Sequence, residues 1–334
     1  MTRVLTVLIT GAGAVTCQSV IKGLRGQPEL NVRLITVDMQ TNVAGRFFSD
    51  AFYQVPAARD EVFIPTLLNI CEQEAVDLLI PSTDYELAKL ALHKPDFEKI
   101  RCTVVISPPE VIEKCNDKWK TFQFFKQNKI PTPKTYLPNK LPAELIFPLF
   151  IKPRRMGHGS KDAHRVDDKA ELTYLLKRIE EPIMQQALEG IEFTIDVLCD
   201  FDGRALNAVP RERIDTRSGV SYKGRTVRDE ELIFSGVNIA EKLGIIGPCN
   251  IQCFKNDLGL FFFEINPRYS GTLPLTLAAG FNSPAVLAQM RLGRRFKPFI
   301  GEFEEGVYMM RYWQEVFVDQ SGMIKNSFTA MGLK

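Results

Sequence analysis

Strand and helix patterns alternate over the first third of the chain. Residues 4–10 form a continuous apolar run, which is typical of a strand that is buried on both faces. Apolar residues at helical spacing follow at 15–24. Strands that alternate with helices predict a parallel sheet in an α/β layer. The two patterns recur, with strands expected at 32–38, 76–81 and 103–107 and helices at 63–74 and 86–92.

The pattern changes beyond residue 112. A helical segment at 116–127 leads into a linker that contains Pro131 and Pro133. Short strand patterns then predominate, and turn residues such as Asp202-Gly203 predict antiparallel hairpins. The chain is therefore expected to combine α/β with α+β architecture. The later strands are expected at 149–152, 183–185, 192–199, 204–210, 249–255 and 260–266, and the helices at 167–178, 230–243 and 284–292.

The last of these strands carries polar residues inside an aromatic run. Residues 261–268 read Phe-Phe-Phe-Glu-Ile-Asn-Pro-Arg. Because side chains alternate along a strand, Glu264 and Asn266 are expected on the face opposite to that of Phe263. A carboxylate and an amide side by side suit Mg²⁺ together with substrate phosphates, and Arg268 would add positive charge beside those phosphates. The alternative is a strand end whose polar residues simply meet water.

Composition narrows the class of protein. The 334 residues are 45% hydrophobic and 25% charged, and the net charge of +2 favours neither a nucleic-acid nor a membrane partner. No apolar stretch approaches the ~20 residues that span a bilayer, and residues 1–13 read as a strand and turn rather than a signal peptide. Seven cysteines without CxxC spacing indicate reduced thiols and a cytoplasmic location. Three dispersed histidines are too few for a zinc site.

The first turn supplies one hypothesis about a cofactor. Gly11-Ala12-Gly13 follows a strand and opens a helix, and Asp38 ends the second strand. This arrangement approaches the dinucleotide-binding fingerprint, but the third glycine position is Thr16. An NAD(P)-dependent oxidoreductase is therefore one alternative, and the helix start could instead bind another small anion.

Two segments in the middle of the chain suit nucleotide binding. Lys152 precedes a basic, glycine-containing loop at 153–161, where backbone N–H groups could approach phosphate oxygens. The loop lacks the Walker A sequence. Residues 185–192 read as strand, turn and strand, and Glu192 could accept hydrogen bonds from ribose hydroxyls. Taken alone, each segment could equally be an ordinary solvated connection.

Further residues could act beside a bound phosphate. Gln252 lies twelve residues before Glu264 across the expected hairpin, so strand pairing would bring another oxygen close to the cation. Arg211 and Arg213 end another strand and could neutralise charge that develops in phosphoryl transfer. The alternative for both arginines is an exposed surface loop. Covalent hydrolase chemistry is not expected, because no Ser-His-Asp or Cys-His arrangement stands out.

In this order and spacing, the segments resemble the ATP-grasp superfamily, especially the carbamoyl-phosphate synthase large-subunit type and its stand-alone carboxylate–amine ligase relatives. The resemblance runs from residue 1 to about residue 300. Its most specific parts are FIKPRRMGHGSK at 150–161, MQQALEGIEFTIDVL at 184–198, NIQCF at 250–254 and FFFEINPR at 261–268.

The resemblance implies a domain organisation. A Rossmann-like domain that binds no dinucleotide would occupy residues 1–112. A two-part ATP-grasp domain would follow at 113–300, with lobes at about 113–190 and 191–300. Residues 301–334 would form a C-terminal extension that packs on the grasp domain.

The resemblance also implies a role for individual residues. Two lysines and a glycine-containing loop would hold the phosphates of ATP, a hinge segment would bind adenine, and a glutamate would bind ribose. One carboxylate and two amides would hold Mg²⁺, for which Mn²⁺ is a substitute. The implied nucleotide ligands are Lys118, Lys152, Gly157, Gly159, Ser160, Gln185, Gln186, Ala187, Leu188 and Glu192; the metal ligands are Gln252, Glu264 and Asn266; and the catalytic residues are Arg268, Lys152 and Arg211.

The expected function is that of an ATP-dependent ligase. ATP would activate a small-molecule carboxylate as an acyl phosphate, and an amine would displace the phosphate. The acceptor is expected between residues 11–14, 82–86 and 269–272. Because the chain has a single synthetase-like unit, we do not expect it to carry out complete carbamoyl-phosphate synthesis alone. A homodimer is compatible with the resemblance. The alternative is a nucleotide-binding regulatory or partner subunit that does not catalyse.

Overall fold

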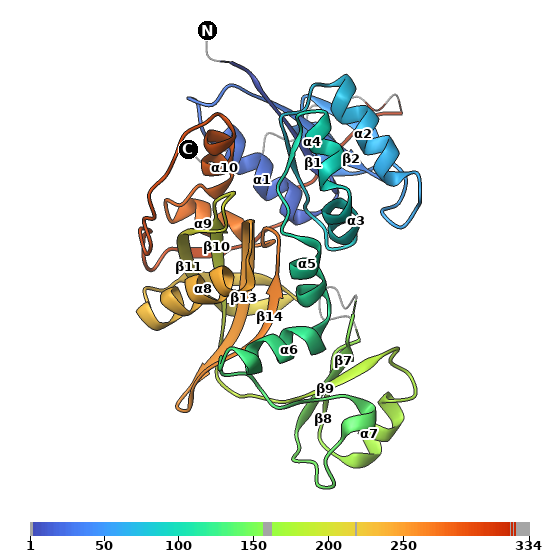
Figure 1. Ribbon diagram of the computed structural model, residues 1–334, viewed down its shortest axis with the longest axis vertical. Helices are drawn as coiled ribbons and strands as arrows, with labels where there is room; N and C mark the ends of the chain where they lie inside the picture. The colour runs from blue at the N-terminus through green and yellow to red at the C-terminus, as the bar shows by residue number, and fades with distance from the viewer. Residues whose placement is uncertain (1–2, 156–161, 218, 321, 323, 325–334) are drawn as a thin grey trace.

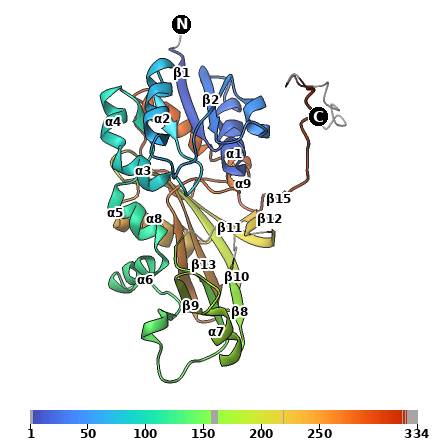
Figure 2. The ribbon, with the colours of Figure 1, turned by 90° about the vertical axis from the view of Figure 1, so that its right-hand side faces the viewer.

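A computed structural model describes residues 3–155, 162–217, 219–320, 322 and 324. Three β-sheets follow one another along the long axis of the molecule (Figure 1). The N-terminal sheet lies at one end, a six-stranded sheet lies in the middle, and a small sheet with helix α7 lies at the other end, as the turned view in Figure 2 also shows. Within the described residues, none of the helices has the length and apolar character needed to cross a membrane.

The N-terminal sheet is parallel, as the alternating pattern predicted. Its strand order is β3-β2-β1-β4-β5. The central strand β1 is buried at every position, in agreement with its continuous apolar sequence. The short strand β3 was missed because its four residues are only partly buried. The elements are β1 (Leu5–Thr10), α1 (Val15–Arg25), β2 (Val32–Asp38), η1 (Ala44–Phe48), β3 (Ala51–Gln54), α2 (Phe63–Gln73), β4 (Leu78–Ile80), α3 (Leu87–Leu92), α4 (Lys94–Lys99) and β5 (Thr103–Val104).

Two helices connect this sheet to the rest of the chain. They are α5 (Pro109–Asn116) and α6 (Lys118–Gln127). Asp117 lies between them and caps α6, because its carboxylate accepts hydrogen bonds from the backbone N–H groups of Trp119 and Lys120. The same carboxylate accepts two hydrogen bonds from Arg154, at 2.8 and 2.6 Å, which fixes the start of α6 against the small sheet.

The small sheet is antiparallel and has the order β6-β9-β7-β8. Its strands are β6 (Thr135–Tyr136), β7 (Leu149–Pro153), β8 (His164–Val166) and β9 (Pro182–Gln186), with η2 (Pro138–Lys140) after β6. Helix α7 (Lys169–Leu175) is shorter than the helix expected at 167–178. Asp168 is its N-cap residue and accepts from two backbone N–H groups of the first turn.

The six-stranded sheet has the order β14-β13-β10-β11-β12-β15, and its pairs are antiparallel. Helix α8 packs against its apolar face, where Gly236 allows close approach because a Cβ there would lie 2.7 Å from a methyl group of Ile195. Helices α9 and α10 pack against α1 of the N-terminal unit. The elements are β10 (Ile191–Cys199), β11 (Ala205–Arg217), β12 (Val220–Thr226), α8 (Glu230–Leu243), β13 (Gly247–Asn256), β14 (Gly259–Asn266), α9 (Leu273–Ala278), α10 (Ser283–Arg291) and β15 (Tyr308–Met310).

Candidate active site

A cavity of about 550 Å³ lies where the three sheets meet. The six-stranded sheet forms one wall, and β7 and β9 of the small sheet, together with Lys118, form the facing wall. The start of α1 and the loop after β4 close the end that belongs to the N-terminal unit. Because carboxyl ends of parallel strands share one edge of a sheet, the turns after β1 and β4 both reach this cavity.

The cavity wall on the six-stranded sheet is polar because of its strand register. Gln252 of β13 pairs with Glu264 of β14 on one side and with Thr194 of β10 on the other. The next row joins Asn250, Asn266 and Asp196. The apolar residues that alternate with them lie on the opposite face, in the core under α8.

One predicted side-chain direction is wrong. Phe263 was expected on the face opposite to Glu264, but both residues line the cavity. The ladder shifts between Gln252 and Cys253, which pair with Glu264 and Phe262, so Phe263 is the extra residue of a β-bulge. Its ring stacks on that of Phe254, with 5.2 Å between the centroids.

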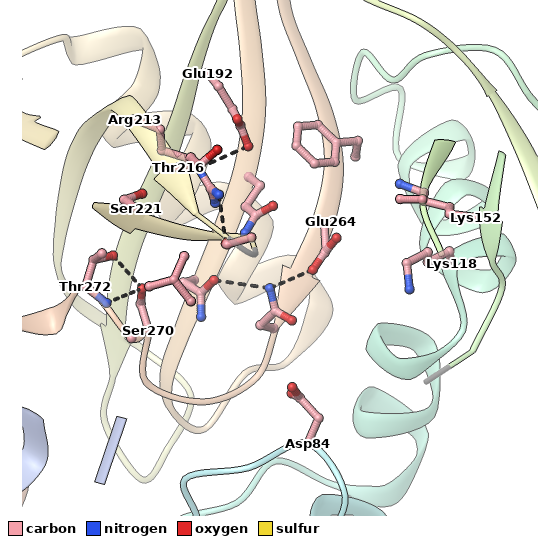
Figure 3. A pocket seen from close by; sticks show the side chains of 18 of the residues that line it. Asp84, Lys118, Lys152, Glu192, Arg213, Thr216, Ser221, Glu264, Ser270 and Thr272 are labelled. Atoms are coloured by element: carbon pink, nitrogen blue, oxygen red, sulfur yellow. Dashed lines mark hydrogen bonds and ion pairs between the residues drawn. The ribbon is translucent and has the colours of Figure 1, made fainter. Parts of the chain in front are cut away.

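Two lysines face the polar wall from the other side of the cavity (Figure 3). Lys118 opens α6, and Lys152 lies on β7. The Lys152 ammonium group donates to Gln185 Oε1 at 3.1 Å and lies 5.5 Å from the centre of the Phe263 ring. Burial lowers the pKa of Lys152 to about 8, although the charge of Glu264 opposes the shift. The side chain of Lys152 therefore changes its charge near pH 8.

Glu264 is held in its charged form by these lysines. Burial alone would raise its pKa, but the charges of Lys118 and Lys152 and a hydrogen bond from Asn266 bring that pKa below its ordinary value. The distance from Asn266 Nδ2 to Glu264 Oε1 is 3.1 Å. The cavity therefore sets one ionised carboxylate opposite two cationic side chains.

The predicted metal ligands form an oxygen-donor set that fits a hard cation. Gln252, Glu264 and Asn266 all line the cavity. The amide nitrogen of Asn266 donates to both Glu264 and Asn250, so its amide oxygen is directed elsewhere. Among the described residues, no cluster of three His, Cys, Asp or Glu could hold a metal alone. A cation here would need phosphate oxygens as well, which suits Mg²⁺.

The predicted nucleotide ligands lie along the same cavity. Gln185, Gln186, Leu188 and Glu192 line it, whereas Ala187 is not among the lining residues. Glu192 forms an ion pair with Arg213, with 3.2 Å between Oε1 and Nε. Burial raises the pKa of Glu192, and Arg213 opposes this shift. Gly157, Gly159 and Ser160 lie outside the described residues.

Arg211, predicted as a catalytic residue, has its partners within the protein itself. This side chain is 1% exposed and does not line the cavity. Its guanidinium group donates to Asp196 Oδ1 at 2.5 Å and to the hydroxyl of Thr272. Arg213, two residues further along the same face of β11, does line the cavity. Arg211 therefore stabilises the structure beside the cavity through Asp196 and Thr272, and Arg213 is the better candidate for ligand contact.

Arg268 lies at the end of the cavity near the N-terminal unit and has a partner that the sequence did not reveal. Its guanidinium group donates two hydrogen bonds to the carboxylate of Asp84, in the loop after β4. Residues 82–86 were expected near the acceptor, but Asp84 itself had no assigned role. The sequence gives no signal for this pair, because 184 positions separate its members.

The first turn is built differently from a dinucleotide site. Ala14, Val15 and Thr16 line the cavity at the start of α1. Asp38, which would have to bind ribose, instead accepts hydrogen bonds from the backbone N–H groups of Gly13 and Gln40 at 2.8 and 2.9 Å. The turn therefore forms one end of a cavity whose other walls come from the later sheets.

Comparisons with protein families match both halves of the chain. Residues 178–312 match the family described as ATP-grasp in the biosynthetic pathway with Ter operon. Residues 7–105 match the PylC-like N-terminal domain. The first match includes the whole six-stranded sheet, and the second includes most of the parallel N-terminal sheet.

Curated relatives include carbamoyl-phosphate synthases. The arginine-specific large chain of Geobacillus stearothermophilus is 26% identical over 221 residues, which cover 61% of this chain and 21% of that protein. A carbamoyl-phosphate synthase of Methanobrevibacter smithii is 25% identical over 262 residues, which cover 70% of each chain. This chain spans about a fifth of the length of the Geobacillus relative.

Solved structures share the fold. The biotin carboxylase domain of Hydrogenobacter thermophilus 2-oxoglutarate carboxylase, with MgADP, ADP and bicarbonate, has a TM-score of 0.72 at 16% identity, over 91% of this chain and 73% of that one. Staphylococcus aureus N5-carboxyaminoimidazole synthetase with ADP also reaches 0.72, at 15% identity, over 90% and 80%. An L-amino acid ligase from Bacillus licheniformis reaches 0.65, at 18% identity, over 91% and 78%.

Proposed function

Because residues 178–312 match an ATP-grasp family and residues 7–105 match a PylC-like N-terminal domain, we propose that this chain is an ATP-dependent ligase that activates a carboxylate as an acyl phosphate for attack by an amine. One observation carries the proposal. The ionised Glu264, with Gln252 and Asn266 beside it, faces Lys118 and Lys152 across a single cavity. Oxygen donors and cationic groups that converge in this way suit a triphosphate and its metal ion.

ATP would lie along the cavity, with its base between the small sheet and the six-stranded sheet. Gln186 and Leu188 would face adenine, and Glu192 would accept hydrogen bonds from ribose. Lys118 and Lys152 would then meet the phosphates as point charges. A bound phosphate would favour the ammonium form of Lys152, whose pKa is lowered to about 8 by burial.

Glu264, Asn266 and Gln252 would hold Mg²⁺, with Mn²⁺ as a substitute. The bound ion would neutralise negative charge on the β- and γ-phosphates. Arg268, at the N-terminal end of the cavity, would place further positive charge beside the transferred phosphoryl group. These residues would act by orientation and electrostatics.

The carboxylate would bind at the end formed by the start of α1, the loop after β4 and residues 270–272. One of its oxygens would attack the γ-phosphorus, and ADP would leave. The amine nitrogen would then attack the carbonyl carbon, and phosphate would leave to give an amide. A covalent thioester route has little support, because all seven cysteines are buried and burial raises the pKa of Cys17 on α1 and of Cys115 on α5.

Solved structures with a similar fold suggest which classes of substrate to test first. One solved neighbour holds bicarbonate, and another is an L-amino acid ligase. We propose bicarbonate, amino acids and small peptides as the first classes to test. A cytoplasmic location is supported by seven free thiols, and a homodimer by the dimer described for the Hydrogenobacter domain.

A screen of ADP release tests the proposal. Purified full-length protein would be incubated with ATP, Mg²⁺ and pairs of carboxylates and amines, and ADP would be measured by a coupled assay. ADP release that requires both members of a pair supports a ligase. Saturable ATP binding without ADP release from any pair would instead favour a regulatory subunit.

A further inference from the structure

The loop after β4 lines the end of the cavity near the N-terminal unit. Asp84 in this loop accepts hydrogen bonds from Arg268 Nε at 2.7 Å and from Arg268 Nη2 at 2.6 Å. The two side chains are 16% and 18% exposed. A two-point contact of this kind fixes the plane of a guanidinium group as well as its position.

The loop itself is anchored by a second carboxylate. Glu86 is 4% exposed, and its Oε1 accepts from the backbone N–H groups of Ser82 and Thr83 at 3.0 Å each. Its Oε2 accepts from the Thr83 hydroxyl at 2.9 Å, and the hydroxyl of Thr10, at the end of β1, donates to the same carboxylate. These hydrogen bonds fix the loop that carries Asp84 against the end of β1 in the parallel sheet.

Three of the five N–H groups of Arg268 donate hydrogen bonds to groups of the protein. A guanidinium group has five N–H groups. Asp84 accepts from two of them, and the carbonyl oxygen of Tyr269 accepts from a third, on Nη1, at 3.0 Å. The other two N–H groups belong to the two terminal nitrogens. Glu264 and Asn266, whose backbone precedes Arg268, line the same cavity.

We propose that Asp84 is a positioning residue of the N-terminal unit that aims Arg268 at the terminal phosphate of ATP. The inference rests on the proposed function, since it takes Arg268 as a phosphate ligand. Asp84 would not contact the nucleotide. Its carboxylate would hold two N–H groups of Arg268 so that the other two face the γ-phosphate, before and during transfer. The N-terminal unit would in this way contribute to the chemistry and not only to acceptor binding.

The test compares a triphosphate with a diphosphate. Dissociation constants of AMP-PNP and ADP, each with Mg²⁺, would be measured by calorimetry on the full chain. The wild-type protein is expected to bind both. Asp84→Asn keeps the shape of the side chain but removes its charge, and it should weaken AMP-PNP binding by about tenfold while changing ADP binding by less than about twofold. Asp84→Glu keeps the charge but displaces it, and it should cause the same selective loss. It replaces Asp84→Asn in the test if that variant does not fold.

A double variant shows whether Asp84 acts through Arg268. Arg268→Gln should cause the same selective loss, and adding Asp84→Asn to it should cause no further loss. Asp167→Asn is the matched control, because Asp167 pairs with Arg165 at 3.0 Å on the exposed surface of the small sheet. It should leave both constants unchanged.

Three outcomes would overturn the inference. An unchanged ratio of the two constants in Asp84→Asn would show that Arg268 needs no positioning. Tighter AMP-PNP binding would show that Asp84 competes with phosphate for Arg268. Additive losses in the double variant would show that Asp84 acts independently of Arg268. A wild-type protein that binds neither nucleotide would instead remove the proposed function itself.

Discussion

Gln252 and Glu264 lie directly opposite each other in the β13–β14 ladder, and both side chains line the cavity. The next row of the sheet adds Asn250 and Asn266, whose amide groups are hydrogen-bonded to each other. Of these four residues, Glu264 is the one with an ionisable side chain. It is therefore the group whose replacement should have the largest effect on phosphate chemistry.

Glu264→Gln should lower the rate of ADP release by about 100-fold or more, because the variant keeps the shape of the side chain but loses the charge that would hold the metal ion. The free energy of unfolding should change by less than about 1 kcal/mol, as for a partly exposed side chain. Steady-state kinetics and urea unfolding check the two effects. Glu171→Gln on α7, outside the cavity, is the control. Normal turnover by Glu264→Gln would refute the metal assignment.

The affinity for ATP should depend on pH through Lys152. Its pKa is lowered by burial to about 8, so the free protein loses this positive charge as the pH rises through that value. Bound phosphate would hold the proton to higher pH, and binding should therefore weaken by about tenfold between pH 7 and pH 9. Calorimetry over this range measures the slope.

The conservative variant Lys152→Arg separates this effect from other titrations, since arginine stays charged throughout. Its affinity for ATP should vary less with pH than that of the wild-type protein. An equal slope in both proteins would mean that another group is responsible.

Arg211 and Arg213 should differ in the property that each affects. Arg211→Met leaves Asp196 buried without its ion-pair partner, and the expected loss is about 3–5 kcal/mol of unfolding free energy. Arg213→Met should cost less stability, because this residue lines the cavity, but it should weaken nucleotide binding through Glu192. Urea unfolding and calorimetry on both variants distinguish the two roles. Equal effects on both measurements would contradict the assignment.

ATP with Mg²⁺ should raise the melting temperature more than NAD⁺ or NADP⁺ does. Ligand that binds only the native state stabilises it by about 2.7 kcal/mol at a hundredfold excess over Kd. The carboxylate of Asp38, which a dinucleotide site would need for ribose, is hydrogen-bonded to Gly13 and Gln40. Thermal unfolding with each nucleotide makes the comparison. Equal stabilisation by NAD⁺ would restore the oxidoreductase hypothesis.

Local sequence patterns predicted the parts of the fold that depend on local periodicity. The strand at 32–38 and the helix at 230–243 have the expected bounds. The pairing of Gln252 with Glu264 also followed from a short turn between two apolar strands. These features depend on neighbours in sequence, which a single chain displays directly.

Features that depend on distant contacts were missed. The bulge that turns Phe263 into the cavity changes the alternation by one residue, and the strand sequence gives no sign of it. Arg211 and Arg213 have the same residue type on the same face, and only the packing of Asp196 separates their roles. The partnership of Asp84 with Arg268 joins two units of the fold. Such contacts come from tertiary packing, which periodicity does not encode.

The central claim is that a carboxylate is activated as an acyl phosphate. Once the ADP-release screen has identified a carboxylate, hydroxylamine would replace the amine in a reaction with ATP and Mg²⁺, and nucleotide products and hydroxamate would be quantified by chromatography. The account predicts hydroxamate in equal amount to ADP and phosphate, with loss of all three in Glu264→Gln. Formation of AMP and pyrophosphate would show adenylation instead, and would contradict the account.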